Sequence, residues 1–447
     1  MGKRSGPAVL LAALLAVAGC GGVGGGGDGD GAEGSGRLTT LGFSLSDEIA
    51  TSRVDSFKQA SPGITVEITE GGFDEQQFLS AVADGNPPDL VYLDRKLIGT
   101  YATRGAVIPL TECVEKHDID VAQYRPAARD QVTLDGVLYG IPEFYSVRLV
   151  YLDEAVLRQA GLTAEQVDLA DWADLPALTD RLARVDGGRL TRIGIDPKIP
   201  EFLPLWARAN GAELLSADGR TARLDDPAVL EALRTAYGLV QRQAGWDRFK
   251  GFRDTFDFFG ADSPLARHQI GVWPMEDWFL NLAAKNTPDA ELVVKPFVDR
   301  QGNPLTLVSG QAWAIPKGAK NPEAACEFAK RMTATDTWVA AAKARVAARQ
   351  ASGAPFTGLY TGNVEADRRI MSEVYRPSGN PRFDQAVQTI VSVQEHAFTI
   401  PASRAGAEFD KAWMDAVNRV LSGQSEPAEA LRRAQSEATA ALDRAAK

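Results

Sequence analysis

One short stretch, GVWPMEDWF, places two tryptophans and two carboxylates within six residues. Trp273 and Trp278 carry flat apolar rings, and Glu276 and Asp277 between them accept hydrogen bonds. Carboxylates are rarely buried without a partner, so this composition would be unusual for a core segment. Ring faces beside acidic acceptors suit a sugar, whose C–H face stacks on an indole while its hydroxyls donate hydrogen bonds. The alternative is that the indoles simply pack in the core.

Catalytic motifs are scarce in this chain. The patterns GxxxxGK[ST], HExxH, GxSxG and CxxC do not occur in the sequence. His117, His268 and His396 are far apart and show no metal-ligand spacing. A carboxylate pair such as Glu276 with Asp94 keeps a glycosidase as an alternative. The scarcity of such motifs argues against an enzyme, and we expect no cofactor and no metal.

The elements that must position these residues follow an α/β pattern. Residues 37–43 read as a strand, residues 46–61 have apolar side chains at helical spacing, and residues 64–68 alternate as a strand does. A helix at 75–83 then leads through two prolines to a short buried strand at 90–93. Strands that alternate with helices predict a lobe in which helices flank a mixed sheet.

A second α/β lobe is predicted further along the chain. A helix from about residue 153 ends near Gly161, and the segments DWADLPALTDRLARV and DDPAVLEALRTAYGLVQRQ form amphipathic helices with aspartates at their starts. Strand then helix return around NPLTLVSGQAWAIP, with Pro322 near the first helical turn. From about residue 365 the pattern is almost wholly helical.

The beginning of the chain has the layout of an export signal. Lys3 and Arg4 precede an apolar run at 7–18, which is too short for the roughly 20 residues that span a bilayer. The sequence VAGC, ending at Cys20, resembles the lipobox of bacterial lipoproteins. That resemblance implies that residues 1–19 are removed and that Cys20 carries the lipid; the alternative is a secretory signal with a chance cysteine. Residues 20–36, mostly glycine, would form a flexible tether.

Composition excludes some classes of function. The 447 residues, 45% hydrophobic and 24% charged, indicate a globular protein of two or three domains. Loss of Lys3 and Arg4 with the signal changes the formal net charge from −11 to −13, which leaves no basic surplus for nucleic acid. Cys113 and Cys326 either form a disulfide in an oxidising compartment or act as separate small hydrophobes.

Several stretches together resemble the solute-binding proteins of ABC importers. They include FKQASPGITVEI, PPDLVYLDRKLIGTYATRGAVIPLT, DGVLYGIPEFYSVRLVYLDEAVLRQAGL, LWARANGAELLSADG, ARHQIGVWPMEDW, GQAWAIPKGAKNPEAACEFAKRM and VLSGQSEPAEALRRAQ. Their order and spacing match the carbohydrate-binding family that includes maltose-binding protein. The resemblance implies a type II periplasmic-binding-protein fold, in which two lobes joined by several hinge crossings close around a central cleft.

The resemblance also implies the lobe boundaries. Residues 37–145 with 309–348 would form lobe 1, and residues 146–308 with 349–447 would form lobe 2. The crossings would fall near residues 143–146, 303–309 and 346–352. A cleft between lobes buries most of a small solute, and the solute would stabilise the closed form.

A set of solute-binding residues is implied at the cleft. Asp94 and Arg95 match an acidic and basic pair that holds sugar hydroxyls in the maltose-binding protein; the alternative is a surface ion pair. Tyr145 stands where the maltose-binding protein has an acidic residue, which puts maltose itself in question. The other implied residues are Phe43, Ser44, Ser46, Glu201, Trp206, Trp273, Glu276, Asp277, Trp278, Gly310, Gln311, Trp313 and Arg404.

The resemblance predicts a monomeric, lipid-anchored receptor on the outer face of the cell membrane. It would capture a mono- or oligosaccharide and deliver it to a permease with cytoplasmic ATPases. The alternatives are the same fold binding a glycerophosphodiester or another polar solute, and a glycosidase. A phosphate-bearing solute would favour more cleft arginines than Arg95, Arg349 and Arg404 supply.

Overall fold

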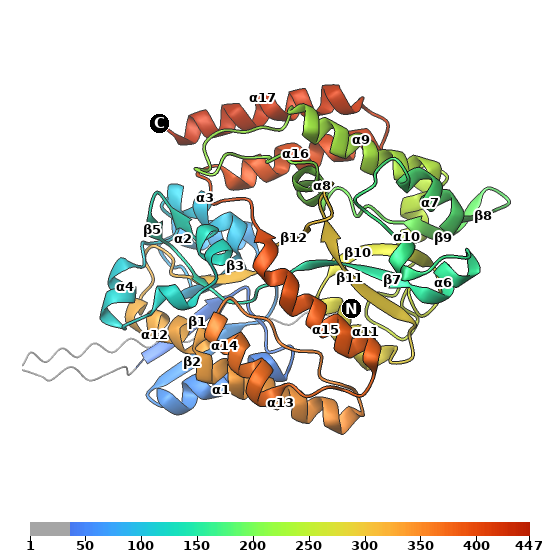
Figure 1. Ribbon diagram of the computed structural model, residues 1–447. Coiled ribbons are helices and arrows are strands. Elements are labelled where there is room, and N and C mark those ends of the chain that lie inside the picture. Colours follow the sequence, from blue (N-terminus) through green and yellow to red (C-terminus); the bar gives the residue numbers. More distant parts are fainter. Residues whose placement is uncertain (1–35) are drawn as a thin grey trace, which may run out of the picture.

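The computed structural model describes residues 36–447 of the chain. The predicted signal, the predicted lipidation at Cys20 and all of the predicted tether except Gly36 lie outside the described residues. The rest folds into two α/β lobes, each built on its own sheet, as predicted (Figure 1).

The first lobe is built on a five-stranded mixed sheet in the order β2-β1-β3-β13-β6. Its strands are β1 (Gly36–Leu41), β2 (Ile64–Thr69), β3 (Leu90–Asp94), β6 (Ile141–Pro142) and β13 (Gln311–Ala314). β1 is parallel to β2 and β3, whereas β13 runs antiparallel to β3 and β6. Strand β13 thus returns to this sheet after the chain has formed six of the seven strands of the second sheet.

Helices cover both faces of this sheet and produce two apolar clusters. One cluster contains Leu38 and Trp313 with side chains of α1 (Glu48–Ala60) and α12 (Pro322–Thr333). The other contains Val91 with side chains of α2 (Glu75–Ala83) and α3 (Ile98–Thr103). Because successive strand residues alternate between faces, Ala312 and Ala314 join the second cluster while Trp313 joins the first.

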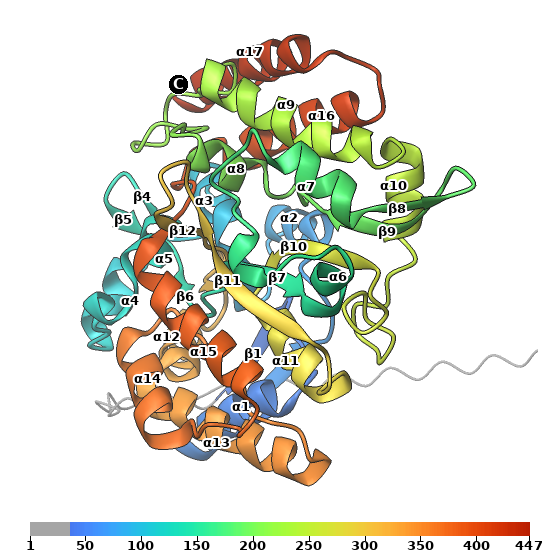
Figure 2. The same ribbon diagram turned by 45° about the vertical axis from the view of Figure 1, so that its right-hand side comes forward.

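The second lobe is built on a seven-stranded sheet in the order β14-β12-β11-β7-β10-β9-β8. Its strands are β7 (Arg148–Asp153), β8 (Arg184–Asp186), β9 (Arg189–Ile195), β10 (Ile270–Glu276), β11 (Leu292–Val298), β12 (Pro304–Leu307) and β14 (Ala397–Phe398). All residues of β7 are buried, because antiparallel β10 and β11 flank it and helices cover it. Figure 2 shows this central position of β7.

The second sheet is surrounded by helices from several parts of the chain. They are α6 (Glu154–Gln159), α7 (Leu175–Leu182), α8 (Leu203–Ala209), α9 (Pro227–Arg242), α10 (Trp246–Arg253), α11 (Trp278–Asn286), α15 (Pro381–Val393), α16 (Gly406–Leu421) and α17 (Pro427–Ala445). In Figure 1, α9, α16 and α17 gather at the upper end, opposite α1 and α13 (Thr335–Ser352). Asp226 caps α9 as predicted, whereas Asp174 at the start of α7 makes no side-chain cap bond; Asp153 caps α6.

Shorter elements complete the fold. They are α4 (Thr111–Lys116), α5 (Pro126–Asp130), the hairpin of β4 (Thr133–Leu134) and β5 (Val137–Leu138), α14 (Val364–Arg369), the 3₁₀ turns Arg95–Leu97, Val121–Gln123, Ala164–Gln166 and Gln394–His396, and the π turn Ile370–Val374. A disulfide joins Cys113 of α4 to Cys326 of α12, with a Cα–Cα distance of 5.7 Å.

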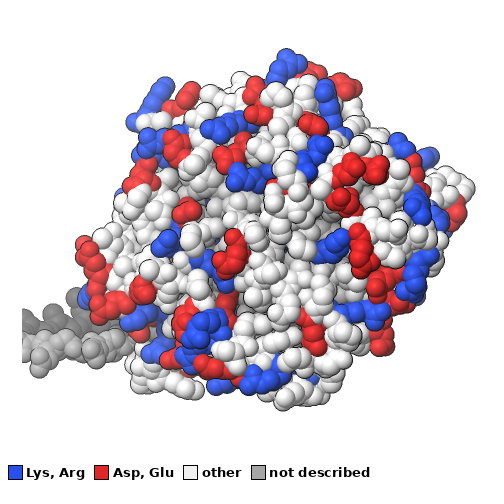
Figure 3. Space-filling view, viewed as in Figure 1, with Lys and Arg blue, Asp and Glu red and all other residues white. Residues whose placement is uncertain are grey.

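On the face seen in Figure 3, acidic and basic side chains are interspersed.

The chain passes between the sheets through the links β6 to β7 and β12 to β13. These links coincide with the predicted crossings near residues 143–146 and 303–309. The third predicted crossing, at 346–352, lies instead within α13, which packs along α1. Residues 361 and 363 then form bridges with Phe144 and Tyr124. We therefore place the change of lobe after residue 374, later than the expected boundary at residue 348.

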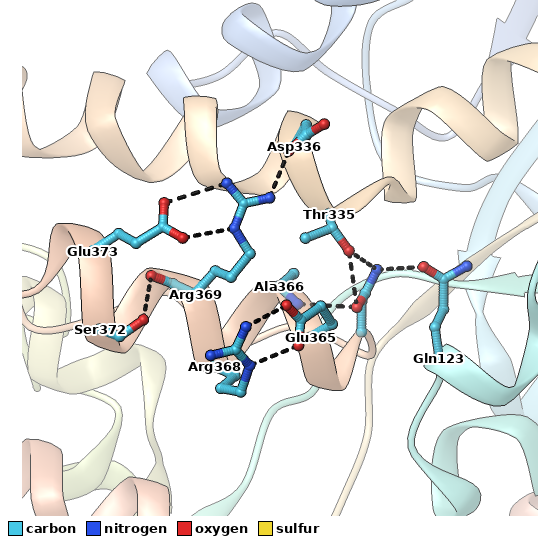
Figure 4. A network of polar contacts seen from close by, with 10 residues as sticks. Gln123, Thr335, Asp336, Glu365, Ala366, Arg368, Arg369, Ser372 and Glu373 are labelled. Atoms are coloured by element: carbon cyan, nitrogen blue, oxygen red, sulfur yellow. Dashed lines mark hydrogen bonds and ion pairs between the residues drawn. The ribbon is translucent and has the colours of Figure 1, made fainter.

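Asn363 fixes this late part of the first lobe. Its buried side chain accepts a hydrogen bond from the Ala366 amide (3.0 Å), which caps α14, and donates to Gln123 Oε1 (2.7 Å) and Thr335 Oγ1 (3.1 Å). Figure 4 shows Gln123 and Thr335 converging on this point. The amide thus joins three chain segments that are distant in sequence.

Replacing Asn363 with alanine is expected to lower the free energy of unfolding by about 2–4 kcal/mol. The variant loses a helix cap, worth about 1 kcal/mol, and leaves buried partners unsatisfied. The measurement is urea unfolding followed by circular dichroism. Asn380 is a matched control, because it caps α15 from a more exposed position and its replacement should cost about 1 kcal/mol. Equal losses for the two variants would contradict the assigned role of Asn363.

Candidate functional site

The two crossings that link the lobes meet at Ser146 and Ser309. Each residue donates its amide to the other's carbonyl, at 3.0 and 3.1 Å. Arg148, at the start of β7, donates to the Ser146 carbonyl (3.1 Å), the Leu307 carbonyl (3.2 Å) and Ser309 Oγ (2.9 Å). One buried guanidinium therefore holds both crossings together.

The carboxylates predicted at residues 276 and 277 lie at this junction. β10 is paired with β7 so that Glu276 faces Arg148, and their charged groups are 3.9 Å apart. Asp277 accepts a hydrogen bond from Ser146 Oγ at 2.6 Å. Burial raises the pKa of Asp277 to about 7, against the opposing effects of the Ser146 hydrogen bond and of Arg148. Asp277 thus holds Ser146 of the first crossing by a hydrogen bond.

Glu276 keeps hydrogen-bonding capacity. Among the described residues, no group donates to its buried Oε2, and the Nε of Arg148 also has no acceptor. Buried polar groups normally have partners, so each such atom calls for one. Both unpartnered atoms are buried at the point where the lobes join.

An exposed aromatic pair lies next to this junction. Trp278 begins α11 and is 39% exposed, and its ring stacks with that of Phe259, with a centroid separation of 6.1 Å and an interplanar angle of 11°. Phe259 is 70% exposed. Asp257 accepts from the Gly260 amide (2.8 Å) and Asn286 donates to the Phe259 carbonyl (2.6 Å), which holds the loop. The sequence analysis missed Phe259, although the run DFFG carries an aromatic signal.

The structure places the other predicted tryptophans in the core. Trp273, expected as the main stacking ring, is 1% exposed and packs edge-on against Phe279 at 4.8 Å. The indole of Trp206 is fully buried and donates to the Pro197 carbonyl at 2.8 Å. Trp313 is also fully buried. These three rings present no open face to a solute, so the alternative of core packing describes them, and the expectation of stacking is corrected for this structure.

Asp94 and Arg95 differ in burial and in their contacts. The Arg95 side chain is fully buried, donates to Gln131 Oε1 at 2.9 Å and bonds the Phe144 carbonyl, and burial lowers its pKa to about 10. It supports the first crossing from inside lobe 1 rather than facing solvent. Asp94, at the end of β3 opposite Gln311, remains half-buried. The pair is therefore not a surface ion pair.

Gly310 explains how this packing is achieved. Its φ is +154°, and a Cβ there would lie 2.1 Å from the Phe144 carbonyl oxygen and 2.5 Å from Arg95 Nη1. A side chain at this position would push the two crossings apart. Gly310 therefore acts through close backbone approach and contributes no polar side chain of its own.

The remaining predicted residues are spread over both lobes. Phe43 is buried against Tyr92, Tyr145 is buried beneath Arg125, and burial raises the pKa of Tyr145 to about 12. Ser44 Oγ accepts from the Gly71 amide at 2.8 Å, while Ser46 and Glu201 are exposed. Arg404 forms an ion pair with Asp135.

The structure thus brings together only part of the predicted set. Asp94, Arg95, Gly310 and Gln311 share the end of the first sheet, and Glu276, Asp277 and Trp278 lie at the junction with lobe 2. Residues that the analysis missed are Ser146, Arg148, Phe259, Lys96 and Asp410. Lys96 and Asp410 form an ion pair at 3.1 Å between the end of β3 and α16. Ser146 and Arg148 lie in the crossing segment EFYSVR, and their position in a predicted crossing could have marked them as site residues.

Residues 36–447 contain no helix with the length and hydropathy needed to cross a membrane. Within the same residues, no three histidine, cysteine or acidic side chains are arranged to hold a metal ion.

Comparison with known proteins now adds to this geometry. Residues 52–355 match the family model of bacterial extracellular solute-binding proteins. The chain belongs to this family. The family and its structural neighbours are binding proteins, and the family name places its members outside the cytoplasm.

Curated relatives cover only part of the molecule. A protein of Brucella abortus strain 2308, described as a binding protein, is 25% identical over 192 residues. The match spans 41% of this chain and 44% of that protein, so the chain spans less than half the length of the curated relative. It supports a binding role without naming a solute.

Solved structures match nearly the whole solute-binding protein. A mannotriose-bound CpMnBP1 structure has a TM-score of 0.71 and 24% identity, covering 90% of this chain and 99% of that one. The acarbose receptor GacH of Streptomyces glaucescens has a TM-score of 0.68 and 18% identity, covering 92% and 99%. The maltotriose-bound MalE domain of Bdellovibrio bacteriovorus has a TM-score of 0.66 and 18% identity, covering 91% and 98%. At these identities the likeness shows the two-lobe fold.

Proposed function

We propose that this solute-binding protein captures a mono- or oligosaccharide outside the cell and delivers it to an ABC permease. The observation that carries the proposal is the exposed ring pair Trp278–Phe259, which lies two residues along the chain from Glu276, whose side chain is 18% exposed. A flat apolar surface beside a carboxylate acceptor matches the two kinds of surface that a sugar presents. The structural neighbours bound to mannotriose, acarbose and maltotriose support the same class of solute.

A phosphate-bearing solute fits this site less well. Phosphate recognition favours arginines with free, forked donors. Arg95 is buried and hydrogen-bonded to Gln131, and the Nη1 of Arg148 donates to the Ser146 and Leu307 carbonyls of the crossings. A neutral polyhydroxyl solute needs no such free cation. The proposal therefore favours a sugar over a glycerophosphodiester.

The remaining parts of the proposal concern the cellular setting. Cys20 would carry a lipid that holds the protein on the outer face of the membrane, with residues 21–36 as the tether. The protein would act as a monomer, pass its sugar unaltered to the permease and perform no catalysis.

Binding to neutral sugars tests the proposal directly. The mature chain is screened by thermal shift against mannose, malto-oligosaccharides, manno-oligosaccharides and glycerophosphodiesters, since a ligand at 100 times its Kd stabilises the folded state by about 2.7 kcal/mol. Calorimetry then measures the affinity for the best sugar. Trp278→Ala is expected to weaken that affinity about 10-fold, the value of a stacking contact of about 1.4 kcal/mol.

Val185→Ala is the matched control. Val185 is also an exposed apolar residue of lobe 2, but it lies on the edge strand β8. The Val185→Ala variant should bind the sugar with the same affinity as the unaltered protein. Absence of any sugar binding, preferential binding of a glycerophosphodiester, or release of cleaved sugar from a bound glycoside would each overturn the proposal.

A further inference from the structure

One carboxylate, that of Asp135, joins three segments of the chain. Asp135 lies in the turn between β4 and β5, with φ of +50°. Its Oδ1 accepts from Arg220 Nη2 at 2.8 Å, and its Oδ2 accepts from Arg404 Nη2 at 2.6 Å and from Arg404 Nε at 3.1 Å. The hydrogen bonds from Arg220 and Arg404 lower the pKa of Asp135, so the carboxylate stays charged at neutral pH.

Asp135 and its partner Arg220 belong to different lobes. β4 packs on α3 and α5, which lie on the first sheet. Arg220 lies in the turn closed by the Leu215–Ala222 bridge, and nearby Leu224 is bonded to Gln435 of α17 in lobe 2. The ion pair between Asp135 and Arg220 is therefore a direct side-chain link between the lobes.

A hollow of about 650 Å³ lies behind this link. It is lined from lobe 1 by residues 126–136, from lobe 2 by residues from 204 to 220, and by the segment 397–402 that connects β14 to α16. The charged contact between Asp135 and Arg220 lies at the edge of this hollow.

The connecting segment is fixed on both sides of the hollow. Ser403 Oγ donates to the Gly219 carbonyl at 2.7 Å, and the Ala402 amide donates to the Asp130 carbonyl at 3.3 Å. Gly219 has φ of +70°, and a Cβ there would lie 2.2 Å from the Ala402 carbonyl oxygen. The segment is thus bonded to both lobes, and Arg404 bonds Asp135 directly beside it.

We propose that Asp135 is an interlobe latch: its contacts with Arg220 and Arg404 hold the lobes in the arrangement of this structure and thereby tune solute affinity. A two-state equilibrium responds to any contact made in only one state, and a solute that prefers one lobe arrangement then binds with altered affinity. The second half of this inference rests on the proposed function, whereas the first half concerns the protein without solute.

Asp135→Asn tests the latch with little change in shape. Asparagine tolerates the positive φ of residue 135, so the turn is kept while the charge is removed. We expect small-angle X-ray scattering of the solute-free mature chain to show a changed radius of gyration, and the affinity for the sugar identified by screening to change about 5-fold. Arg220→Gln should produce the same two changes, and the double variant should add little to either single one.

Glu213→Gln is the matched control, because Glu213 lines the same hollow but pairs with Arg208 within lobe 2. It should leave scattering and affinity unchanged. If Asp135→Asn and Arg220→Gln scatter and bind as the unaltered protein does, the latch is refuted while sugar binding stands. If the scattering changes but no sugar binds to any form, the latch stands and the proposed function fails.

Discussion

Replacing Glu143 with glutamine is expected to lower the free energy of unfolding by about 3–5 kcal/mol, because it removes one partner of a fully buried ion pair. Glu143 Oε1 lies 2.8 Å from Arg53 Nη1, and the two side chains are 0% and 1% exposed. The remaining guanidinium would stay buried without a counter-charge. Burial raises the pKa of the Glu143 carboxyl, and Arg53 opposes that shift.

The same carboxylate organises the aromatic core of lobe 1. It accepts hydrogen bonds from Tyr92 Oη at 3.0 Å and from the Trp313 indole. Arg53 in turn lies over the ring of Trp338 at 4.2 Å from the centroid. Because Glu143 begins the first crossing, its loss should loosen the hinge as well as the core.

Urea unfolding followed by tryptophan fluorescence measures the effect of Glu143→Gln. Glu213→Gln provides the control, since the Arg208–Glu213 pair is about 40% exposed on both sides and should contribute less than about 1 kcal/mol. Restoring stability by pairing Glu143→Leu with Arg53→Met would show that the cost comes from the unpaired charge. Equal losses for Glu143→Gln and Glu213→Gln would refute the assigned role.

The fold could be predicted well because the sequence patterns that indicate strands and helices act over a few residues and can be read one after another along the chain. Alternating strand residues, aspartates at helix starts and prolines at helix ends each act within a few residues, and their order along the chain defined two α/β lobes. The departure at residues 346–352 has the same origin: the helical pattern there is real, but whether α13 stays with lobe 1 depends on its packing against α1, which local pattern does not encode.

The candidate site was predicted less completely because side-chain exposure depends on neighbours distant in sequence. Trp273 and Trp278 are five residues apart, yet strand β10 buries the first between strands and α11 exposes the second. Arg95 reads as one of a surface pair, but β13, arriving more than 200 residues later, places Gly310 against it. Such contacts come only from the tertiary fold.

Removing the disulfide between Cys113 and Cys326 is expected to lower the free energy of unfolding by about 2–5 kcal/mol. The two cysteines are 213 residues apart, and the whole sheet of lobe 2 except β14 is formed between them. Lobe 1 is thus made of two distant chain segments, and the bond keeps α4 and α12 close even in the unfolded chain. The cross-link lowers the conformational entropy of the unfolded chain, so the oxidised protein loses less entropy when it folds.

Urea unfolding of the mature chain with and without dithiothreitol measures this contribution. The oxidised protein should unfold at a higher midpoint than the reduced protein, in keeping with an extracellular family whose members meet oxidising conditions. The double variant Cys113→Ala with Cys326→Ala should match the reduced protein and show no response to the reductant. Because lobe 2 contains neither cysteine, the change should appear in lobe 1 first, as faster amide exchange in α4 and α12. A reduced protein with the same midpoint and the same exchange in α4 and α12 would mean that packing alone holds the two segments together.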